Sequence, residues 1–339
     1  MITQLTLDRL RGLRLIAQLL GTSTAFPRTP AQNSVVGVAK HLVAAQAQNR
    51  PAVLKAIDLR TGADAGAAAD ALNRSLLIRT WSQRGTHHLL AAEDVRWMTL
   101  LCSPRVLAAS TGRRSALGLD HTAVDRARDI LMSHATEPVG RQRAYELFAA
   151  VGVDPGANRG QHLLRHFGGE GTLVQGPPQG SPQGAEDTFV LLDAVCPLSI
   201  DLTGDAALEE MTVRYFRARG PATAKDLQWW SGLKLADIRR GITLAEGAGE
   251  IGPVAGPGGE AMWMPTWAVD VTEAEIEATL EQVLDLPAFD EYLLSYTNRS
   301  HVMDSEHLIS IGPGKNGIFK AFRVIRGEAL PVVAGTAGV

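Results

Sequence analysis

The chain has 339 residues, 45% of them hydrophobic, and a formal net charge of −3. A chain of this length can bury a large core, and it suggests two or three domains. No apolar run approaches the roughly 18 residues of a membrane span, and the start, MITQLTLDRLRGL, lacks the apolar stretch of a signal peptide. We therefore expect a cytoplasmic protein without membrane segments.

The charge is unevenly distributed along the chain. Residues 1–114 carry 15 Lys/Arg and 6 Asp/Glu, a net +9, whereas residues 115–200 carry −4 and residues 201–339 carry −8. A basic first third on an acidic body is typical of a protein in which one region faces phosphates. A basic solvated face without a partner gives the same sums, so charge alone leaves both interpretations open.

The first 90 residues predict three helices followed by a hairpin. In LTLDRLRGLRLIAQLL (5–20), apolar residues recur at helical spacing on one face, which predicts an amphipathic helix. VVGVAKHLVAAQ (35–46) and PAVLKAIDLR (51–60) predict two more helices with a break between them. SLLIRTWSQRGTHHLL (75–90) alternates like the two strands of a β-hairpin.

Residues 137–167 and 219–242 repeat one plan. In each, a Gly near the start is followed by a short helix, a turn at Gly152 or Gly232, and a second helix. The two turn glycines lie 80 residues apart, as do the matching acidic-Leu pairs in the first helices. This self-similarity predicts two copies of a helix-turn-helix.

A β-hairpin pattern follows each second helix. Residues 168–193 and 245–267 both contain apolar strand segments that flank a tip rich in Gly and Pro. Thr223 and Asp226 have the spacing of a capping box at a helix start. A helix-turn-helix followed by a hairpin is the winged-helix plan, and the first 90 residues fit the same plan with a long inserted loop.

These patterns predict an α+β fold of three tandem winged-helix units and a β-rich C-terminal segment. The expected boundaries are residues 1–115, 116–200, 201–283 and 284–339. The basic excess falls on the first unit. That distribution suggests a division of labour rather than a purely structural array.

Several conspicuous residues receive a structural interpretation. Cys102 and Cys196 lie far apart without metal-ligand spacing, so we expect two buried thiols and no metal site. Trp229 and Trp230 at a helix end are expected in the core. GPGKNG at 312–317 matches a dinucleotide fingerprint, but a strand pattern follows where a helix is required, so we expect a turn and no cofactor.

Four motifs occur in order: LVAAQAQNRPAVLKAIDLR, RTWSQRGTHHLLAAEDVRWM, RGPATAKDLQWWSGL and LPAFDEYLLSYTNRS. Together they resemble the winged-helix family of the AlkZ-like DNA glycosylases and, more distantly, YcaQ-like proteins, over most of residues 5–325. The resemblance implies a C-shaped molecule with a central channel for DNA. It also implies a hydrolase that removes damaged bases from DNA.

The resemblance assigns catalysis to Gln46 and Gln48. AlkZ-like members carry Gln-x-Gln at this place, and YcaQ-like members carry Gln-x-Asp. A purine alkylated at N7 or N3 already carries positive charge, so its glycosidic bond breaks without a strong general acid, and the sugar gains oxocarbenium character. Two fixed amides can then orient a water toward C1′. A helix-end pair that bonds nearby backbone is the alternative.

Supporting residues are expected on the predicted first wing. Arg84 can bind a phosphate, and Thr86 or His88 can support the catalytic segment; an ion pair for Arg84 and a core position for His88 are the alternatives. His87 alternates to the opposite face of the strand, where we expect it to be exposed. Two histidines on opposite faces do not share a metal, so we expect none here.

Further candidates follow the glutamines and lie in the tail. Asn49 and Arg50 follow where relatives often have an acidic residue. Arg50, together with Lys55 and Arg60 on the next predicted helix, is a candidate DNA contact or supporting residue. In relatives the segment with Asp290 and Arg299 lies beside the DNA channel. Asp290 is expected to pair with Arg299, with assistance to the water as the alternative.

The leading hypothesis is a monomeric DNA glycosylase whose partner is double-stranded DNA with bulky or cationic N-alkylpurines, including interstrand crosslinks. It implies a nucleoid-associated protein. We expect no Schiff base, because Lys40 and Lys55 are the only lysines among the first 200 residues. Arg exceeds Lys, 27 to 6, which is typical of a GC-rich genome and is compatible with self-resistance in an antibiotic producer.

Two other functions compete with this hypothesis. A non-catalytic winged-helix regulator would read base edges from its recognition helix, where the sequence offers only Arg60 and Lys55. A protein-interaction scaffold is the second alternative, favoured if the channel proves acidic. Release of alkylated bases from a duplex distinguishes the glycosylase from both.

Overall fold

The structure, a computed structural model, describes residues 4–62, 64–180, 186–314 and 317–332. The chain divides into two compact units: unit 1 contains residues 1–68 and 208–339, and unit 2 contains residues 69–207. Both helices and strands contribute, which confirms the α+β class. None of the helices in the described ranges has the length and apolar character needed to cross a bilayer.

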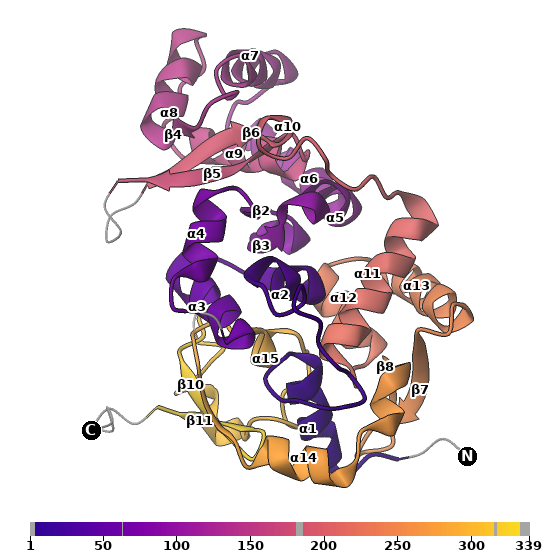
Figure 1. Ribbon diagram of the computed structural model, residues 1–339. Helices are drawn as coiled ribbons and strands as arrows, with labels where there is room; N and C mark the ends of the chain where they lie inside the picture. Colours follow the sequence, from indigo (N-terminus) through magenta and orange to yellow (C-terminus); the bar gives the residue numbers. More distant parts are fainter. Residues whose placement is uncertain (1–3, 63, 181–185, 315–316, 333–339) are drawn as a thin grey trace. The chain divides into compact units, whose positions relative to one another are not determined.

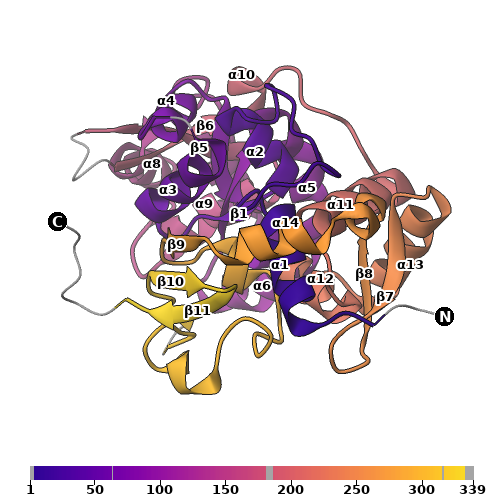
Figure 2. The same ribbon diagram turned by 60° about the horizontal axis from the view of Figure 1, so that its bottom comes forward.

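Unit 1 consists of helices, a hairpin and a small sheet (Figure 1). Its helices are α1 (Leu7–Ala17), α2 (Val35–Leu42), α3 (Arg50–Thr61), most of α11 (Gly204–Arg219), α12 (Ala224–Ser231), α13 (Leu235–Gly247), α14 (Glu273–Leu280) and α15 (Glu291–Leu294). Its strands are β1 (Ala45–Gln46), the antiparallel pair β7 (Ile251–Ala255) and β8 (Ala261–Pro265), and β9 (Val283–Leu286), β10 (Phe322–Ile325) and β11 (Glu328–Pro331). The last three form a sheet in the order β11-β10-β9, side by side in Figure 2.

Helix α1 lies in the core of unit 1. The Thr6 hydroxyl caps its start by accepting a hydrogen bond from the Arg9 N–H, at 3.2 Å. Gly12 allows α14 to approach closely, since a Cβ at this position would lie 2.8 Å from Ile276 Cγ2. The predicted helix is confirmed, but it is not amphipathic along its second half. Every residue from Gly12 to Ala17 is buried, because α14 and the C-terminal segment share a hydrophobic core with it.

The third unit's predicted helix-turn-helix is found in unit 1. Helix α12 begins with the predicted capping box: the Thr223 hydroxyl accepts the Asp226 N–H at 3.1 Å, and the Asp226 carboxylate accepts the Thr223 N–H at 2.9 Å. Gly232 ends the helix with φ 77°, a left-handed conformation that favours glycine. Helix α13 and the β7–β8 hairpin follow in the predicted order.

Unit 2 contains one antiparallel sheet with helices around it. Its strands, in the order β3-β2-β5-β6-β4, are β2 (Leu77–Trp81), β3 (His87–Ala91), β4 (Val139–Gly140), β5 (Leu173–Gln179) and β6 (Glu186–Leu191). Its helices are most of α4 (Ala67–Asn73), α5 (Val95–Cys102), α6 (Pro104–Ala116), α7 (His121–Met132), α8 (Arg141–Ala150), α9 (Arg159–Gly169) and α10 (Leu192–Val195). The short 3-10 helices η1 (Gln83–Gly85) and η2 (Ala92–Asp94) flank β3, and η3 (Thr266–Asp270) and η4 (Ser305–Leu308) belong to unit 1.

The second predicted helix-turn-helix is found in unit 2. Helices α8 and α9 are joined at Gly152, whose φ is 74°, and the β5–β6 pair follows. The predicted hairpin tip at 181–185 lies outside the described residues. Core residues include Leu163 and Phe189, and both cysteines of the chain are free and buried, as expected.

The first predicted winged-helix unit, residues 1–115, is divided between the two compact units. Helices α1, α2 and α3 belong to unit 1, whereas the predicted hairpin, found as β2 and β3, belongs to unit 2. The four segment boundaries, the channel and the C-shape stay predictions.

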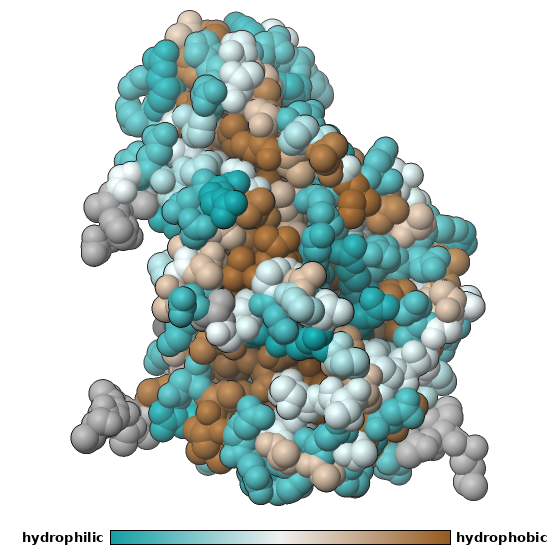
Figure 3. Space-filling view, viewed as in Figure 1, coloured by the Kyte–Doolittle hydropathy of each residue, from teal (hydrophilic) through white to brown (hydrophobic). Residues whose placement is uncertain are grey.

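The C-terminal hairpin of unit 1 carries hydrophobic surface. Figure 3 shows hydrophobic residues gathered over β10 and β11. Ile325 is 40% exposed and Val332 is 50% exposed, whereas Phe322 and Val324 on the same hairpin are buried. The alternation of a strand thus directs one face of β10 into the core and the other to solvent.

Candidate active site

The two glutamines lie on a short irregular segment between α2 and α3. Helix α2 ends at Leu42, four residues before the predicted end, because Val43 adopts a positive φ of 62° that does not continue a helix. The Asn49 side chain then caps α3 by accepting the Ala52 N–H at 3.1 Å. Residues 43–47 between the two helices are therefore buried, with β1 among them, whereas Gln48 and Asn49 are exposed.

The side chains of Gln46 and Gln48 contact each other. Gln46 Nε2 donates to Gln48 Oε1, and the Gln48 backbone N–H donates to Gln46 Oε1 at 3.2 Å. Gln46 is 6% exposed, whereas Gln48 is exposed. Each amide oxygen accepts one of these hydrogen bonds and retains a second lone pair. The pair therefore presents two acceptors whose orientation is fixed by mutual contact.

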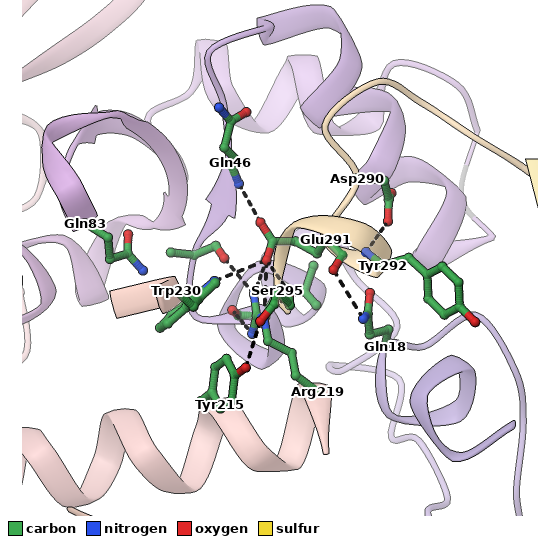
Figure 4. A network of polar contacts seen from close by, with 12 residues as sticks. Gln18, Gln46, Gln83, Tyr215, Arg219, Trp230, Asp290, Glu291, Tyr292 and Ser295 are labelled. Atoms are coloured by element: carbon green, nitrogen blue, oxygen red, sulfur yellow. Dashed lines mark hydrogen bonds and ion pairs between the residues drawn. The ribbon is translucent and has the colours of Figure 1, made fainter. Parts of the chain in front are cut away.

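Glu291 anchors the backbone of this segment. The Gln46 N–H donates to Glu291 Oε1 at 2.8 Å, so the first residue of α15 holds the peptide that carries the first glutamine. Figure 4 shows the Gln46 carboxamide pointing away from this carboxylate. The backbone is thus fixed from one side, and the amide is left for contacts on the other.

A buried arginine completes the anchor. Arg219, at the end of α11, donates to Glu291 Oε2 through Nη2 at 2.9 Å, and to the carbonyls of Leu42 and Ala44 at 2.8 and 2.9 Å. Its own side chain is 0% exposed, and Ser295 Oγ accepts from its Nε at 2.8 Å. One guanidinium therefore holds both the carboxylate and the residues that lead into the glutamine motif.

The Glu291 carboxylate accepts hydrogen bonds through both oxygens and is ionised. Its Oε2 also accepts from Trp230 Nε1 at 3.2 Å and from Ser295 Oγ at 2.8 Å. Burial by itself raises the pKa of Glu291, but the charge of Arg219 and the hydrogen bonds from Gln46, Arg219 and Ser295 outweigh burial, so the pKa lies below its ordinary value. A carboxylate in this state is neither a proton donor nor a free base.

Asp290 forms a second buried ion pair, with Arg60 and not with the predicted Arg299. Both Asp290 oxygens accept from Arg60, at 2.7 and 2.9 Å, and Arg60 Nε donates to the Gln18 carbonyl at 3.0 Å. Asp290 also caps α15 through the Tyr292 N–H at 2.9 Å, so its side chain turns inward toward α3. The expected Asp290–Arg299 pair is wrong.

Arg60 is not a DNA contact, because it is 1% exposed. Arg299 donates from Nε to the Leu293 carbonyl at 2.8 Å and lies over the Phe319 ring, 5.2 Å from its centroid. Trp229 also differs from expectation: it is 43% exposed, because α12 turns Trp230 into the core and its neighbour away from it. Of the two tryptophans expected in the core, Trp230 lies there and Trp229 does not.

The remaining candidates of unit 1 lie on α3. Arg50 is its first residue and is half-buried, and Lys55 is exposed one turn further on. A separate pocket of about 320 Å³ lies between α2 and α11, with Lys40, Arg214 and Arg217 among its lining residues. Neither Gln46 nor Gln48 lines this pocket.

Arg84 and Thr86 belong to the β2–β3 turn of unit 2, and His88 is the second residue of β3. Arg84 and Thr86 are half-buried, and His88 is 0% exposed, with Nδ1 3.0 Å from the Thr86 carbonyl oxygen. The core alternative for His88 is therefore the one found. The proposed support of the catalytic segment by these residues stays a prediction.

His87, which was expected to be exposed, is half-buried. Its Nδ1 lies 3.2 Å from an Arg79 nitrogen, and its Nε2 lies 3.1 Å from Gln175 Nε2. Side chains from β2 and β5 therefore cover the face of β3 on which His87 lies. Burial first, and then the Arg79 charge, lower the pKa of His87 to about 2, so the ring is neutral.

The sequence reasoning missed Glu291 and Arg219. Glu291 stands beside Asp290 in the recognised tail motif, and Arg219 opens the recognised RGPATAKDLQWW motif, so position within a motif was the available signal. No short-range sequence pattern links Glu291 to Arg219, because the two residues are 72 positions apart. Within the described ranges, no group of three or more His, Cys, Asp or Glu side chains is arranged to hold a metal ion.

Comparison with known proteins places the chain in a family. The family model "DNA glycosylase AlkZ-like" matches residues 39–335, which include Gln46, Gln48, Arg219 and Glu291. The chain therefore belongs to the AlkZ-like DNA glycosylase family, as the sequence motifs predicted.

One solved structure is similar to this chain, the DNA glycosylase AlkZ of Streptomyces sahachiroi. The TM-score is 0.77 at 20% sequence identity, and the match covers 96% of this chain and 87% of that one. At this identity the likeness shows the fold. A search of curated proteins finds no match.

Proposed function

We propose that this glycosylase hydrolyses the bond between deoxyribose and a cationic N-alkylated purine, with a water oriented by Gln46 and Gln48. The observation that carries the proposal is the direct contact between the two carboxamides on a segment anchored by Glu291 and Arg219. Fixed acceptors of this kind lower the barrier by orienting the nucleophile before the reaction begins.

The reaction balances without an acid or a cofactor. The C1′–N bond breaks, and its electron pair neutralises the positive charge of the alkylated purine. The water oxygen forms a bond with the oxocarbenium-like C1′ and then releases a proton to solvent. Water that donates its hydrogens to the free lone pairs of Gln46 Oε1 and Gln48 Oε1 keeps its own lone pairs directed toward C1′.

The ionised state of Glu291 favours the assignment of a cationic substrate. Its carboxylate is ionised and accepts hydrogen bonds through both oxygens, so it does not protonate a leaving base. A base that departs without protonation must already carry charge, as purines alkylated at N7 or N3 do. We therefore assign Glu291 as a positioning residue and N-alkylpurines, with bulky adducts and crosslinks among them, as the substrate class.

Base release from a defined duplex tests the proposal. Purified protein is incubated with a duplex that contains one N7-methylguanine, with the same duplex carrying unmodified guanine, and with a duplex carrying a bulky N7 adduct. We expect abasic sites in both alkylated duplexes and none in the unmodified one. The Gln46→Ala/Gln48→Ala protein is the matched control. Equal release by parent and control contradicts the assignment of the glutamines, and no release by the parent contradicts the substrate class.

We further propose a monofunctional mechanism. Lys40 lines the α2–α11 pocket and Lys55 is exposed on α3, and neither belongs to the glutamine segment. Borohydride added during turnover should trap no covalent protein–DNA adduct. A trapped adduct that disappears in a Lys40→Arg or Lys55→Arg protein would replace the water by a lysine nucleophile.

The alternative function, a non-catalytic DNA-binding regulator, depended on Arg60 and Lys55 to contact base edges. A recognition helix that reads base edges needs exposed side chains on its surface. Arg60 is buried against Asp290, which leaves Lys55 alone of the pair that the sequence offered.

A further inference from the structure

Helix α6 of unit 2 is a surface helix with only positive charges. Its sequence, PRVLAASTGRRSA, contains three arginines and no acidic residue, and none of its residues is buried. A Cβ at Gly112 would meet no atom within 4 Å, so open space surrounds the middle of the helix. A solvated helix ordinarily mixes both signs of charge, since the pairs stabilise it.

Two arginines near each other lack a carboxylate partner. Arg113 on α6 and Arg165 on α9 are both exposed, and neither forms an ion pair within the described part of the chain. The pKa of the Arg165 guanidinium is lowered first by partial burial and then by the charge of Arg113. Because α6 packs against α9 and the charge of Arg113 acts on Arg165, the two guanidiniums belong to the same surface of unit 2.

The fold holds Arg165 in this position. Its guanidinium packs against Gly85 in the β2–β3 turn, where any side chain would collide with it, and Gly85 has a φ of 66° that favours glycine. Leu107 of α6 packs against Gly169 of α9, so the two helices approach closely. The arginines are thus presented by packed elements rather than by loops.

The surroundings add positive potential. Burial, and then the charges of His166, Arg114, Arg113 and Arg165, lower the pKa of His162 to about 4. The nearby acid Glu170 is occupied by Arg128 at 2.7 Å and by His166 at 3.2 Å. No carboxylate is therefore left to neutralise the two arginines in this part of the described structure.

We propose that Arg113 and Arg165 form a surface that binds the phosphates of duplex DNA and that shares no residue with the glutamine pair. Guanidiniums are the side chains best suited to phosphate oxygens. Neither α6 nor α9 carries a bulky exposed apolar side chain of the kind that inserts into membranes. The choice of DNA as the anion rests on the proposed function. The surface adds a site that binds DNA and takes no part in the hydrolysis.

The dependence of affinity on salt measures such contacts. Each phosphate contact adds about 0.9 to the slope of log K against log salt, and its loss weakens binding roughly 10-fold at 0.1 M salt. The full-length Arg113→Gln/Arg165→Gln protein should therefore bind an undamaged duplex with a slope about 1–2 units shallower than the parent. Its rate of base release at saturating enzyme should equal the parental rate, because the glutamine pair is untouched.

Matched controls separate a local contact from net charge. Arg126→Gln/Arg143→Gln removes two exposed charges of unit 2 that stand near acidic residues of their own helices, and it should keep the parental slope. Arg113→Lys/Arg165→Lys keeps both charges and should also keep it. An unchanged slope in the Arg113→Gln/Arg165→Gln protein, or an equal loss in the control, overturns the proposal. Absence of base release in every protein would instead reject the proposed function, because binding to undamaged DNA does not require it.

Discussion

The contact between Gln46 and Gln48 predicts strong coupling between their substitutions. Gln46 Nε2 donates to Gln48 Oε1, and Gln46 Oε1 accepts the Gln48 N–H at 3.2 Å, so truncation of either side chain releases the other. Loss of one polar contact that aligns the transition state typically lowers the rate by about 10²–10³, or about 3–4 kcal/mol. Each alanine variant should show a loss of this size.

The double variant distinguishes one shared water from two independent roles. Independent contributions would multiply to a loss of about 10⁴–10⁶. Because each glutamine fixes the other, we expect the double variant to lose only about 10²–10³, which corresponds to a coupling free energy of about 3–4 kcal/mol.

Single-turnover base release, with enzyme in excess over an N7-methylguanine duplex, gives the rate of the chemical step. Fluorescence anisotropy on the same duplex gives the dissociation constant, which should change less than about 3-fold, since phosphate contacts dominate affinity. Full multiplicative loss in the double variant refutes the shared water. Parental rates in both single variants refute the catalytic assignment. A loss of affinity in proportion to rate makes the glutamines DNA contacts.

Three further predictions concern the same network. Gln48→Asp should retain a substantial part of the single-turnover rate, because a carboxylate oxygen also accepts from water. Glu291→Gln should lower the melting temperature near neutral pH, and it should lose less further stability on acidification than the parent. The lowered pKa of Glu291 means that its ionised form stabilises the fold above about pH 4.3, and this contribution is lost as the pH falls through the folded value; equal acid sensitivity of both proteins would contradict the buried pair. Asp290→Asn should cost about 3–5 kcal/mol in urea unfolding, because it leaves Arg60 buried without its counter-charge, whereas Asp290→Asn/Arg60→Met should recover most of that loss, and no recovery would argue against the pair.

Local patterns in the sequence predicted local structure well. The capping box of Thr223 and Asp226 and the left-handed turns at Gly152 and Gly232 depend on residues within a few positions of each other, so their signals lie in short stretches. The motif singles out Gln46 and Gln48, and their catalytic role stays a prediction.

The supports of the site could not be predicted in the same way. Arg60 and Asp290 are separated by 230 positions, and Arg219 and Glu291 by 72, so no local pattern pairs them. The expected partner of Asp290 is Arg299, nine positions away, whereas the structure pairs Asp290 with Arg60. The exposure of Trp229 likewise depended on how α12 packs, since two adjacent aromatic residues of a helix face different directions.

Because the ribosome makes the chain from its N-terminus, the two anchoring carboxylates are added long after the residues that they hold. Unit 1 is discontinuous: its first part ends at residue 68 and its second begins at residue 208, while unit 2 is one continuous stretch between them. Unit 2 can therefore fold while unit 1 waits for its second half.

Asp290 follows its partner Arg60 by 230 positions, and Glu291 follows Gln46, whose backbone it binds, by 245 positions. The nascent chain thus carries its glutamines long before it can hold them in place. A chain that lacks residues 284–339 would retain the Gln-x-Gln motif but not the two carboxylates that hold Arg60 and the Gln46 backbone.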